Sequence, residues 1–154
     1  MPTQTLTRID INFKFGECNG FMNLEIRDKS SQLLVLNNIE EADQKITLDL
    51  EFPNVLEFVS TGKNLHADTK LDKDNNIIAD KFVKLLSMNV GYVPVNQYVL
   101  QTICKFQPKN AKPIYNLYWY TNGKASIEFN DENFLRWHLR KNYIQLLNQD
   151  DVAV

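Results

Sequence analysis

Cysteine is scarce: the 154 residues include only two, Cys18 and Cys104, and they lie far apart in the sequence. Two distant cysteines form neither the disulfide framework of a small secreted domain nor a CxxC metal or redox motif. We therefore expect two reduced, buried or half-buried thiols in a chain made in a reducing cytosol. A single bridge between them is the alternative, and it requires α carbons within about 6 Å of each other.

Long apolar runs are absent as well. No stretch approaches the roughly 20 apolar residues of a membrane-spanning helix. The N-terminal MPTQTLTRIDINFKF has neither an apolar core nor a cleavage site of small residues. The sequence thus predicts no membrane partner and no signal peptide. The formal net charge of −2 gives no general attraction to a nucleic-acid backbone, so we expect no nucleic-acid partner.

Catalytic motifs are missing too. The two histidines, His66 and His138, form no HxH or HExxH arrangement, and no GxSxG or Cys-His pattern occurs. The pair Gly62-Lys63 lacks the frame of a phosphate-binding GxxxxGK[ST] loop, and it is typical of a turn that follows a strand. These absences predict a protein that is not an enzyme.

Apolar residues instead alternate with polar ones at a period of two, which is the pattern of half-buried strands. In RIDINFKF, for example, isoleucine and phenylalanine alternate with aspartate, asparagine and lysine. Turn residues such as glycine, proline and asparagine separate the segments. The expected strands are residues 8–15, 21–27, 44–52, 54–60, 80–90, 98–106, 113–120 and 124–130.

Eight to ten short strands at intervals of about ten residues predict an all-β fold with little helix. We expect one domain, residues 1–154, built as a jelly-roll-like sandwich of two antiparallel sheets. Asn122-Gly123 predicts a tight hairpin turn, because a type I′ turn needs positive φ at both positions. Residues 38–45 could hold one helical turn. The C-terminal segment predicts a last strand at 134–140 and a short helix at 142–149.

The stretch from residue 60 to residue 82 is rich in carboxylates and amides. Three of them have the spacing of the first EF-hand ligands, but Ile77 and Val83 stand where that loop needs glycine and glutamate. A solvated loop whose Asp and Asn side chains form turns is one interpretation. A looser calcium site is the other. A glycosidase pair is disfavoured, because it needs carboxylates facing each other across a cleft. The candidate metal ligands are Asp68, Asp72, Asp74, Asn76 and Asp80.

Aromatic residues cluster in YNLYWY. On a strand, Tyr118 and Tyr120 share one face and Trp119 points to the other. One face packs in a core, and the other is a candidate platform for sugar rings or a protein partner. Core packing with hydroxyls at the rim explains the cluster equally well. The candidate ligand or interface residues are Tyr118, Trp119, Tyr120 and Trp137.

The segment LEFVSTGKNLHADTKLDKDNNIIADKFVKLLSMNV resembles small proteins of tailed phages, especially of marine myoviruses. The resemblance covers residues 45–140 and departs at Asn75, where the pattern usually has glycine; asparagine tolerates the positive φ of that turn. It implies a sandwich like that of carbohydrate-binding modules, a place in the virion, and no catalytic residue. The matching elements are Gly62, Lys63, Asn64, Asp68, Thr69, Asp72, Asn76, Ile77, Ile78, Asp80, Lys81, Asn122-Gly123, SIEF and FLRWHL.

Together these patterns predict a non-catalytic binding or assembly module. Following the resemblance, we expect a virion protein of a phage tail, baseplate or head that presents a surface to another protein, to a second copy of itself or to a glycan. The alternative is a free carbohydrate-binding module stabilised by calcium. An enzyme that acts on polysaccharide is the third hypothesis, and it requires a cleft with two opposed carboxylates.

Overall fold

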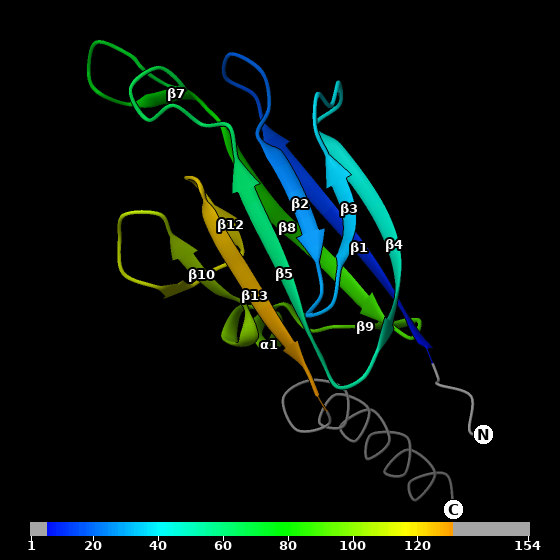
Figure 1. Ribbon diagram of the computed structural model, residues 1–154. Coiled ribbons are helices and arrows are strands. Elements are labelled where there is room, and N and C mark those ends of the chain that lie inside the picture. Colours follow the sequence, from blue (N-terminus) through cyan, green and yellow to red (C-terminus); the bar gives the residue numbers. More distant parts are fainter. Residues whose placement is uncertain (1–5, 131–154) are drawn as a thin grey trace, which may run out of the picture.

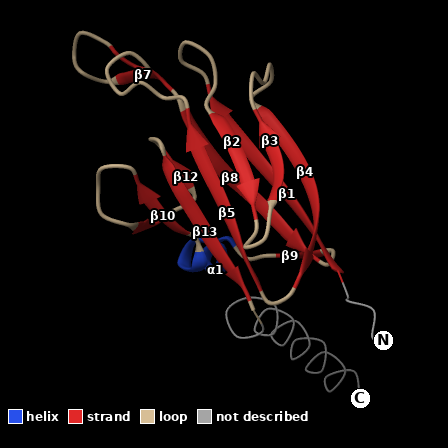
Figure 2. Ribbon diagram, viewed as in Figure 1, coloured by secondary structure: helices blue, strands red, loops and turns tan. Residues whose placement is uncertain are grey.

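The computed structural model describes residues 6–130, which fold into two antiparallel β-sheets packed face to face with one short helix at an end (Figures 1 and 2). This arrangement confirms the predicted two-sheet sandwich. No helix within this range is long and apolar enough to cross a membrane.

The first sheet has the order β12-β8-β1-β4, with β9 paired to the end of β8, and every pairing is antiparallel. It is built on long strands at its centre, where β1 pairs with β4 on one side and β8 on the other. The strands are β1 (Leu6–Gly16), β4 (Asp43–Glu51), β8 (Phe82–Val90), β9 (Val93–Pro94) and β12 (Tyr118–Trp119).

The second sheet has the order β11-β10-β13-β5-β2-β3, again antiparallel throughout. A separate two-stranded hairpin, β6–β7, projects from the end of the sandwich between β5 and β8 (Figure 1). The strands are β2 (Asn23–Arg27), β3 (Gln32–Leu36), β5 (Asn54–Thr61), β6 (Thr69–Leu71), β7 (Ile77–Asp80), β10 (Lys105–Pro108), β11 (Ile114–Tyr115) and β13 (Gly123–Phe129).

The core lies between the sheets and is made by the apolar half of each alternating strand. Trp119 is fully buried at its centre. The ring centroids of Phe58, Phe13 and Phe106 lie 5.3, 6.1 and 6.2 Å from that of Trp119. These rings come from both sheets, so they join the two layers; aromatic pairs at this spacing add to the free energy of burial.

A β-bulge explains why β8 breaks its own alternation. Phe13 pairs with Leu85 while Asn12 pairs with Ser87, so one extra residue of β8 lies between them. Val83 and Leu85 face the core before the bulge, and Met88 and Val90 face it afterwards. The bulge thus lets the apolar side chains of β8 face the core both before and after it.

Four sequence predictions are wrong here. Residues 113–120 are not one strand, because β11 and β12 are two-residue strands that belong to different sheets. Residues 98–106 are not one strand: Asn96 caps helix α1 (Gln97–Ile103) by accepting from the Tyr98 amide, and only then does β10 begin. Asn122-Gly123 is not a hairpin turn, because β12 and β13 belong to different sheets and neither residue has positive φ. Residues 38–45 hold no helical turn. The predictions for 134–140, 142–149 and Trp137 lie outside the described residues.

Two turn predictions and one cysteine prediction are confirmed. Gly62 leaves β5 with a φ of 92°, and Asn75 adopts a φ of 65° in the β6–β7 turn. Cys18 and Cys104 are both buried free thiols. Burial raises the pKa of the Cys104 thiol to about 12, so this side chain is a packing residue with no thiolate at neutral pH.

Candidate functional site

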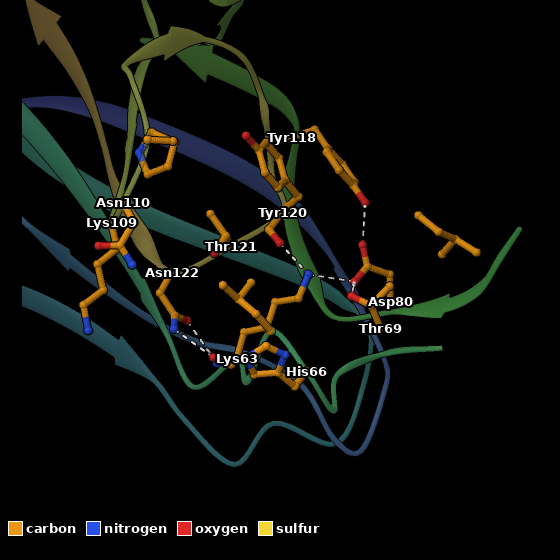
Figure 3. Close-up of a pocket in the computed structure, with 14 residues that line it drawn as sticks. Lys63, His66, Thr69, Asp80, Lys109, Asn110, Tyr118, Tyr120, Thr121 and Asn122 are labelled. Carbon is orange, nitrogen blue, oxygen red and sulfur yellow. Dashed lines mark hydrogen bonds and ion pairs between the residues drawn. The ribbon is translucent and has the colours of Figure 1, made fainter. Parts of the chain in front are cut away.

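A pocket of about 720 Å³ opens at the end of the sandwich that carries the β6–β7 hairpin. One wall comes from the loop after β5 and from the hairpin, and the other comes from the loop after β10 (Figure 3). The segment after β12 completes it. The lining residues are Lys63, Leu65, His66, Thr69, Ile77, Asp80, Pro108, Lys109, Asn110, Ala111, Tyr118, Tyr120, Thr121 and Asn122.

Tyr118 and Tyr120 are the aromatic part of this pocket. Their rings stack, with centroids 6.3 Å apart and planes 21° from parallel. Phe82 packs against Tyr118, with ring centroids 4.8 Å apart, and Phe106 packs against Tyr120, with ring centroids 6.2 Å apart. Tyr120 is 38% exposed. The predicted aromatic platform is therefore formed in part, by the two tyrosines that share a face.

Trp119 does not belong to that platform. It points to the opposite face, is fully buried, and donates its indole Nε1–H to the Asn116 carbonyl at 3.0 Å. Its assignment as a ligand or interface residue is thus corrected to a core residue. The cause is the strand alternation itself, which sends neighbouring residues to opposite sides.

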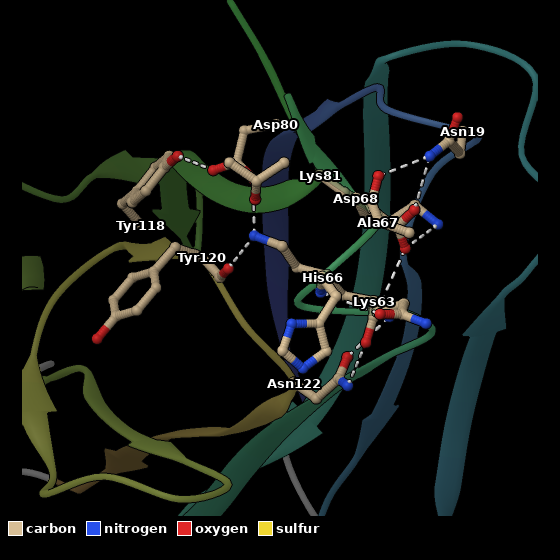
Figure 4. Close-up of polar contacts among 12 residues, drawn as sticks. Asn19, Lys63, His66, Ala67, Asp68, Asp80, Lys81, Tyr118, Tyr120 and Asn122 are labelled. Carbon is tan, nitrogen blue, oxygen red and sulfur yellow. Dashed lines mark hydrogen bonds and ion pairs between the residues drawn. The ribbon is translucent and has the colours of Figure 1, made fainter. Parts of the chain in front are cut away.

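A buried ion pair stands directly behind the tyrosines. The Lys63 ammonium donates to the Asp80 carboxylate at 2.7 Å and to the Tyr120 backbone carbonyl (Figure 4). Asp80 also accepts from Thr69 at 2.7 Å and from the Tyr118 hydroxyl at 3.3 Å. Burial alone would raise the pKa of Asp80, but the hydrogen bonds from Lys63 and Thr69 outweigh it and hold that pKa below its ordinary value.

Asp80 in turn affects Tyr118. Burial and the neighbouring carboxylate raise the pKa of the Tyr118 hydroxyl to about 12. The hydroxyl therefore stays protonated at neutral pH and donates a hydrogen bond to the Asp80 carboxylate. This bond fixes the ring that forms half of the stacked pair.

A second buried pair lies beside the first. Lys81 Nζ is 3.1 Å from the Asp68 carboxylate and donates to the Gly62 carbonyl at 3.1 Å. Asp68 also accepts from the Asn64 amide at 2.8 Å and from the Asn19 side chain at 3.1 Å. These bonds, the Asn64 amide first, hold the pKa of Asp68 below its ordinary value. The loop after β5 is thereby closed on itself and tied to the β1–β2 loop.

The remaining acidic residues shape the β6–β7 turn. Asp72 accepts from the backbone amides of Asp74 and Asn76 at 2.8 and 2.9 Å, which is the behaviour of an Asx turn. The hydrogen bond from the Asn76 amide is the largest effect that lowers the pKa of Asp72. This part of the stretch is the solvated, turn-forming loop of the first interpretation.

The five predicted calcium ligands are therefore not brought together. Asp68 and Asp80 each hold a lysine, and Asp72 is occupied by its own turn with Asp74 and Asn76. Among residues 6–130, no group of three or more His, Cys, Asp or Glu side chains gathers closely enough to hold a metal ion. In this structure the five side chains form two ion pairs and a turn.

Several polar groups of the pocket have no partner within the described chain. No hydrogen bond or ion pair there engages the side chains of His66, Lys109, Asn110 or Thr121, or the hydroxyl of Tyr120. The pocket thus combines an exposed aromatic surface with free donors and acceptors. The 108–111 loop carries no functional motif in the sequence, and it reaches the site only through the pairing of β10 with β13.

The fold and this site define the class: a β-sandwich with a partly aromatic pocket at one end. No family model matches the sequence, and no curated protein matches it in sequence. Among solved structures, the chain is similar to the selenomethionine form of vCBM60, described with two families of calcium-dependent carbohydrate-binding modules. The TM-score is 0.53 at 9% identity, over 79% of this chain and 90% of that one.

The second structure is vCBM60 in complex with galactobiose. It has a TM-score of 0.52 at 10% identity, over 79% of this chain and 97% of that one. At such low identity the likeness establishes the fold alone, a two-sheet sandwich similar to that of vCBM60, as the resemblance had implied. Neither likeness shows a phage origin, so the virion location stays a prediction.

Proposed function

We propose that this chain is a non-catalytic glycan-binding module and that the pocket beside Tyr118 and Tyr120 receives the sugar. The observation that carries the proposal is Tyr120, 38% exposed and stacked on Tyr118, within a 720 Å³ pocket that also holds free hydrogen-bonding groups. A sugar ring has an apolar face that packs on an aromatic ring and hydroxyls that need polar partners. The shared fold supports the same function.

The polar partners of the sugar would come from the pocket rim. The hydroxyls of Thr121 and Tyr120 and the amide of Asn110 both donate and accept, as sugar hydroxyls require. Lys109 adds a cation to the same rim. Because the side chains belong to different loops, the pocket selects a ligand by shape as well as by hydrogen bonds.

Hydrolysis is disfavoured by the carboxylates. Asp80 is the one carboxylate among the residues that line the pocket, and it is committed to Lys63, Thr69 and Tyr118. A glycosidase needs two carboxylates across the bond, one of them with a raised pKa, whereas the pKa of Asp80 is lowered.

The test is direct binding. A glycan array is screened first, and hits are measured by calorimetry with free oligosaccharide; galactobiose is one probe, because it is the ligand of the similar module. We expect saturable binding that Tyr120→Ala weakens by about 5- to 30-fold, from roughly 1 to 2 kcal/mol of lost stacking. Tyr98→Ala, at an 81% exposed tyrosine on α1, is the matched control. Glycan binding that ignores Tyr120, or no binding to any glycan, rejects the proposal.

A second candidate is docking to protein, as in virion assembly. Leu71, Ile77 and Ile78 are 51, 63 and 66% exposed on the β6–β7 hairpin, which stands out from the sandwich (Figure 1). Exposed apolar residues gathered on one element are typical of interaction surfaces. Light scattering of the purified chain tests self-association. A dimer that Ile78→Glu dissociates favours this candidate, and a monomer in both cases removes self-association through the hairpin.

A further inference from the structure

We infer that Lys63 and Lys81 are built-in cations that replace calcium in this module, and that Lys63 also positions the two tyrosines of the pocket. The inference starts from their burial. Their side chains are only 4 and 7% exposed, and each ammonium lies between one carboxylate and one backbone carbonyl (Figure 4). Carboxylates and backbone carbonyls are also the ligands that calcium takes from proteins.

The two lysines join segments that are distant in sequence. Lys63, in the loop after β5, contacts Asp80 at the end of β7 and the carbonyl of Tyr120 after β12. Lys81, between β7 and β8, reaches back to Asp68 and to the Gly62 carbonyl. Together they hold the loop, the hairpin and the post-β12 segment in one arrangement. Joining separate loops through oxygen ligands is the structural work that a bound cation does.

The charges leave no place for a further cation. Two ammonium groups balance the two carboxylates of Asp68 and Asp80. A calcium ion at the same oxygens would sit beside two buried positive charges, and like charges at short range in a water-poor site repel strongly. Each lysine would have to leave before calcium could bind.

The pocket depends on one of the pairs more than on the other. Lys63 bonds the backbone of Tyr120, and its partner Asp80 accepts the Tyr118 hydroxyl, so the first pair contacts both tyrosines. The second pair contacts Gly62, Asn64 and Asn19, and no hydrogen bond of the described chain links Lys81 or Asp68 to a tyrosine. Lys63 is thus a positioning residue for the ligand, while Lys81 supports the loop.

Thermal unfolding with chelator and with calcium tests the cation replacement, and it does not rest on the proposed function. We expect the same melting temperature for the unaltered chain in EDTA and in millimolar CaCl₂. Lys63→Met and Lys81→Met should each lower it by several degrees, and Lys70→Met, at an exposed lysine of β6, should leave it unchanged. A melting temperature of the unaltered chain that falls in EDTA or rises in CaCl₂ overturns the inference.

Calorimetric titration with the best glycan tests the positioning role, which does rest on the proposed function. At a temperature where both variants are folded, Lys63→Met should bind roughly tenfold more weakly. Lys81→Met should keep the affinity of the unaltered chain. Equal losses in the two variants would show a merely structural effect and reject the positioning role. If the unaltered chain binds no glycan, the proposed function fails, and the melting experiments still decide the cation replacement.

Discussion

Replacing Asp80 by asparagine isolates the charge of the pair behind the pocket. Asparagine has the size of aspartate and keeps one oxygen that can accept from Thr69 or Tyr118, which now donate at 2.7 and 3.3 Å. It loses the negative charge that faces Lys63 Nζ at 2.7 Å. The substitution therefore leaves a buried ammonium without a counter-ion while it disturbs the packing little.

The size of the loss follows from the burial of Lys63. Its side chain is 4% exposed, so water cannot replace the carboxylate. Removing one member of a buried pair costs about 3 to 5 kcal/mol of unfolding free energy. Because the asparagine oxygen still accepts a hydrogen bond, we expect the lower end, about 3 kcal/mol. For a chain of about 150 residues this corresponds to a melting temperature about 6 to 12 °C lower.

Urea unfolding of four proteins gives the coupling: the unaltered chain, Asp80→Asn, Lys63→Met and the double variant. We expect the double variant to lose less than the sum of the single losses, by about 1 to 3 kcal/mol, because removing both charges leaves no isolated ion. Additive losses of unfolding free energy would refute the reasoning, because they mean that the two side chains have no interaction energy. An Asp80→Asn loss below about 0.5 kcal/mol, the range of surface substitutions, would refute it equally.

Three further predictions concern acid, the β10–β13 contact and the core. The folded chain lowers the pKa values of Asp68 and Asp80, so their contribution to stability is present above the ordinary pKa of aspartate and is lost as pH falls through the lowered values. Urea midpoints measured into the acid range should fall, and less steeply in Asp80→Asn. Gly123→Ala should cost about 1 to 3 kcal/mol in urea unfolding, because a β carbon there would lie 2.4 Å from the Gln107 carbonyl oxygen. Trp119→Ala should cost about 3 to 5 kcal/mol by the same assay, as a fully buried side chain, whereas a surface residue of the platform would cost little.

The sheets could be predicted from the sequence because each strand carries its own evidence. In β1, the four apolar residues of RIDINFKF fall on one side and are all buried. Such alternation is a local property, so it needs no knowledge of the partner strand. Strand β3 was missed for the same reason: QLLVL has four apolar residues in five and no alternation.

The wrong predictions for 98–106 and 122–123 came from sequence features that are compatible with two different local structures. Residues 98–106 are rich in β-branched and aromatic side chains, which favour a strand. The capping asparagine, Asn96, was the visible sign of a helix start. Asn122-Gly123 likewise has the composition of a type I′ turn. The glycine is needed there for a different reason, the close approach of β13 to β10, and that approach is a property of the folded sheet.

The site was harder to predict, because its decisive contacts join distant residues. Lys63 and Tyr120 are 57 positions apart, and Asp80 and Tyr118 are 38 apart. The acidic stretch offers five candidate metal ligands, and Lys63 and Lys81, which flank them, carry no local sequence sign of burial. Their burial arises only when the loop after β5 folds against the hairpin and the segment after β12. Strand alternation predicts that Tyr118 and Tyr120 share a face, and their rings do stack in the structure; their role in binding stays a prediction.

A built-in ammonium and a bound calcium ion predict different sensitivities, and this difference separates two mechanisms on the same fold. Both use carboxylates, so both lose stability when acid protonates Asp68 and Asp80. Only a bound calcium ion can be removed by a chelator, because the ammonium is covalently part of the chain. A sandwich that is sensitive to acid and insensitive to EDTA therefore has its cation in its side chains. One that is sensitive to both has kept the metal, and the lysines would then need another role.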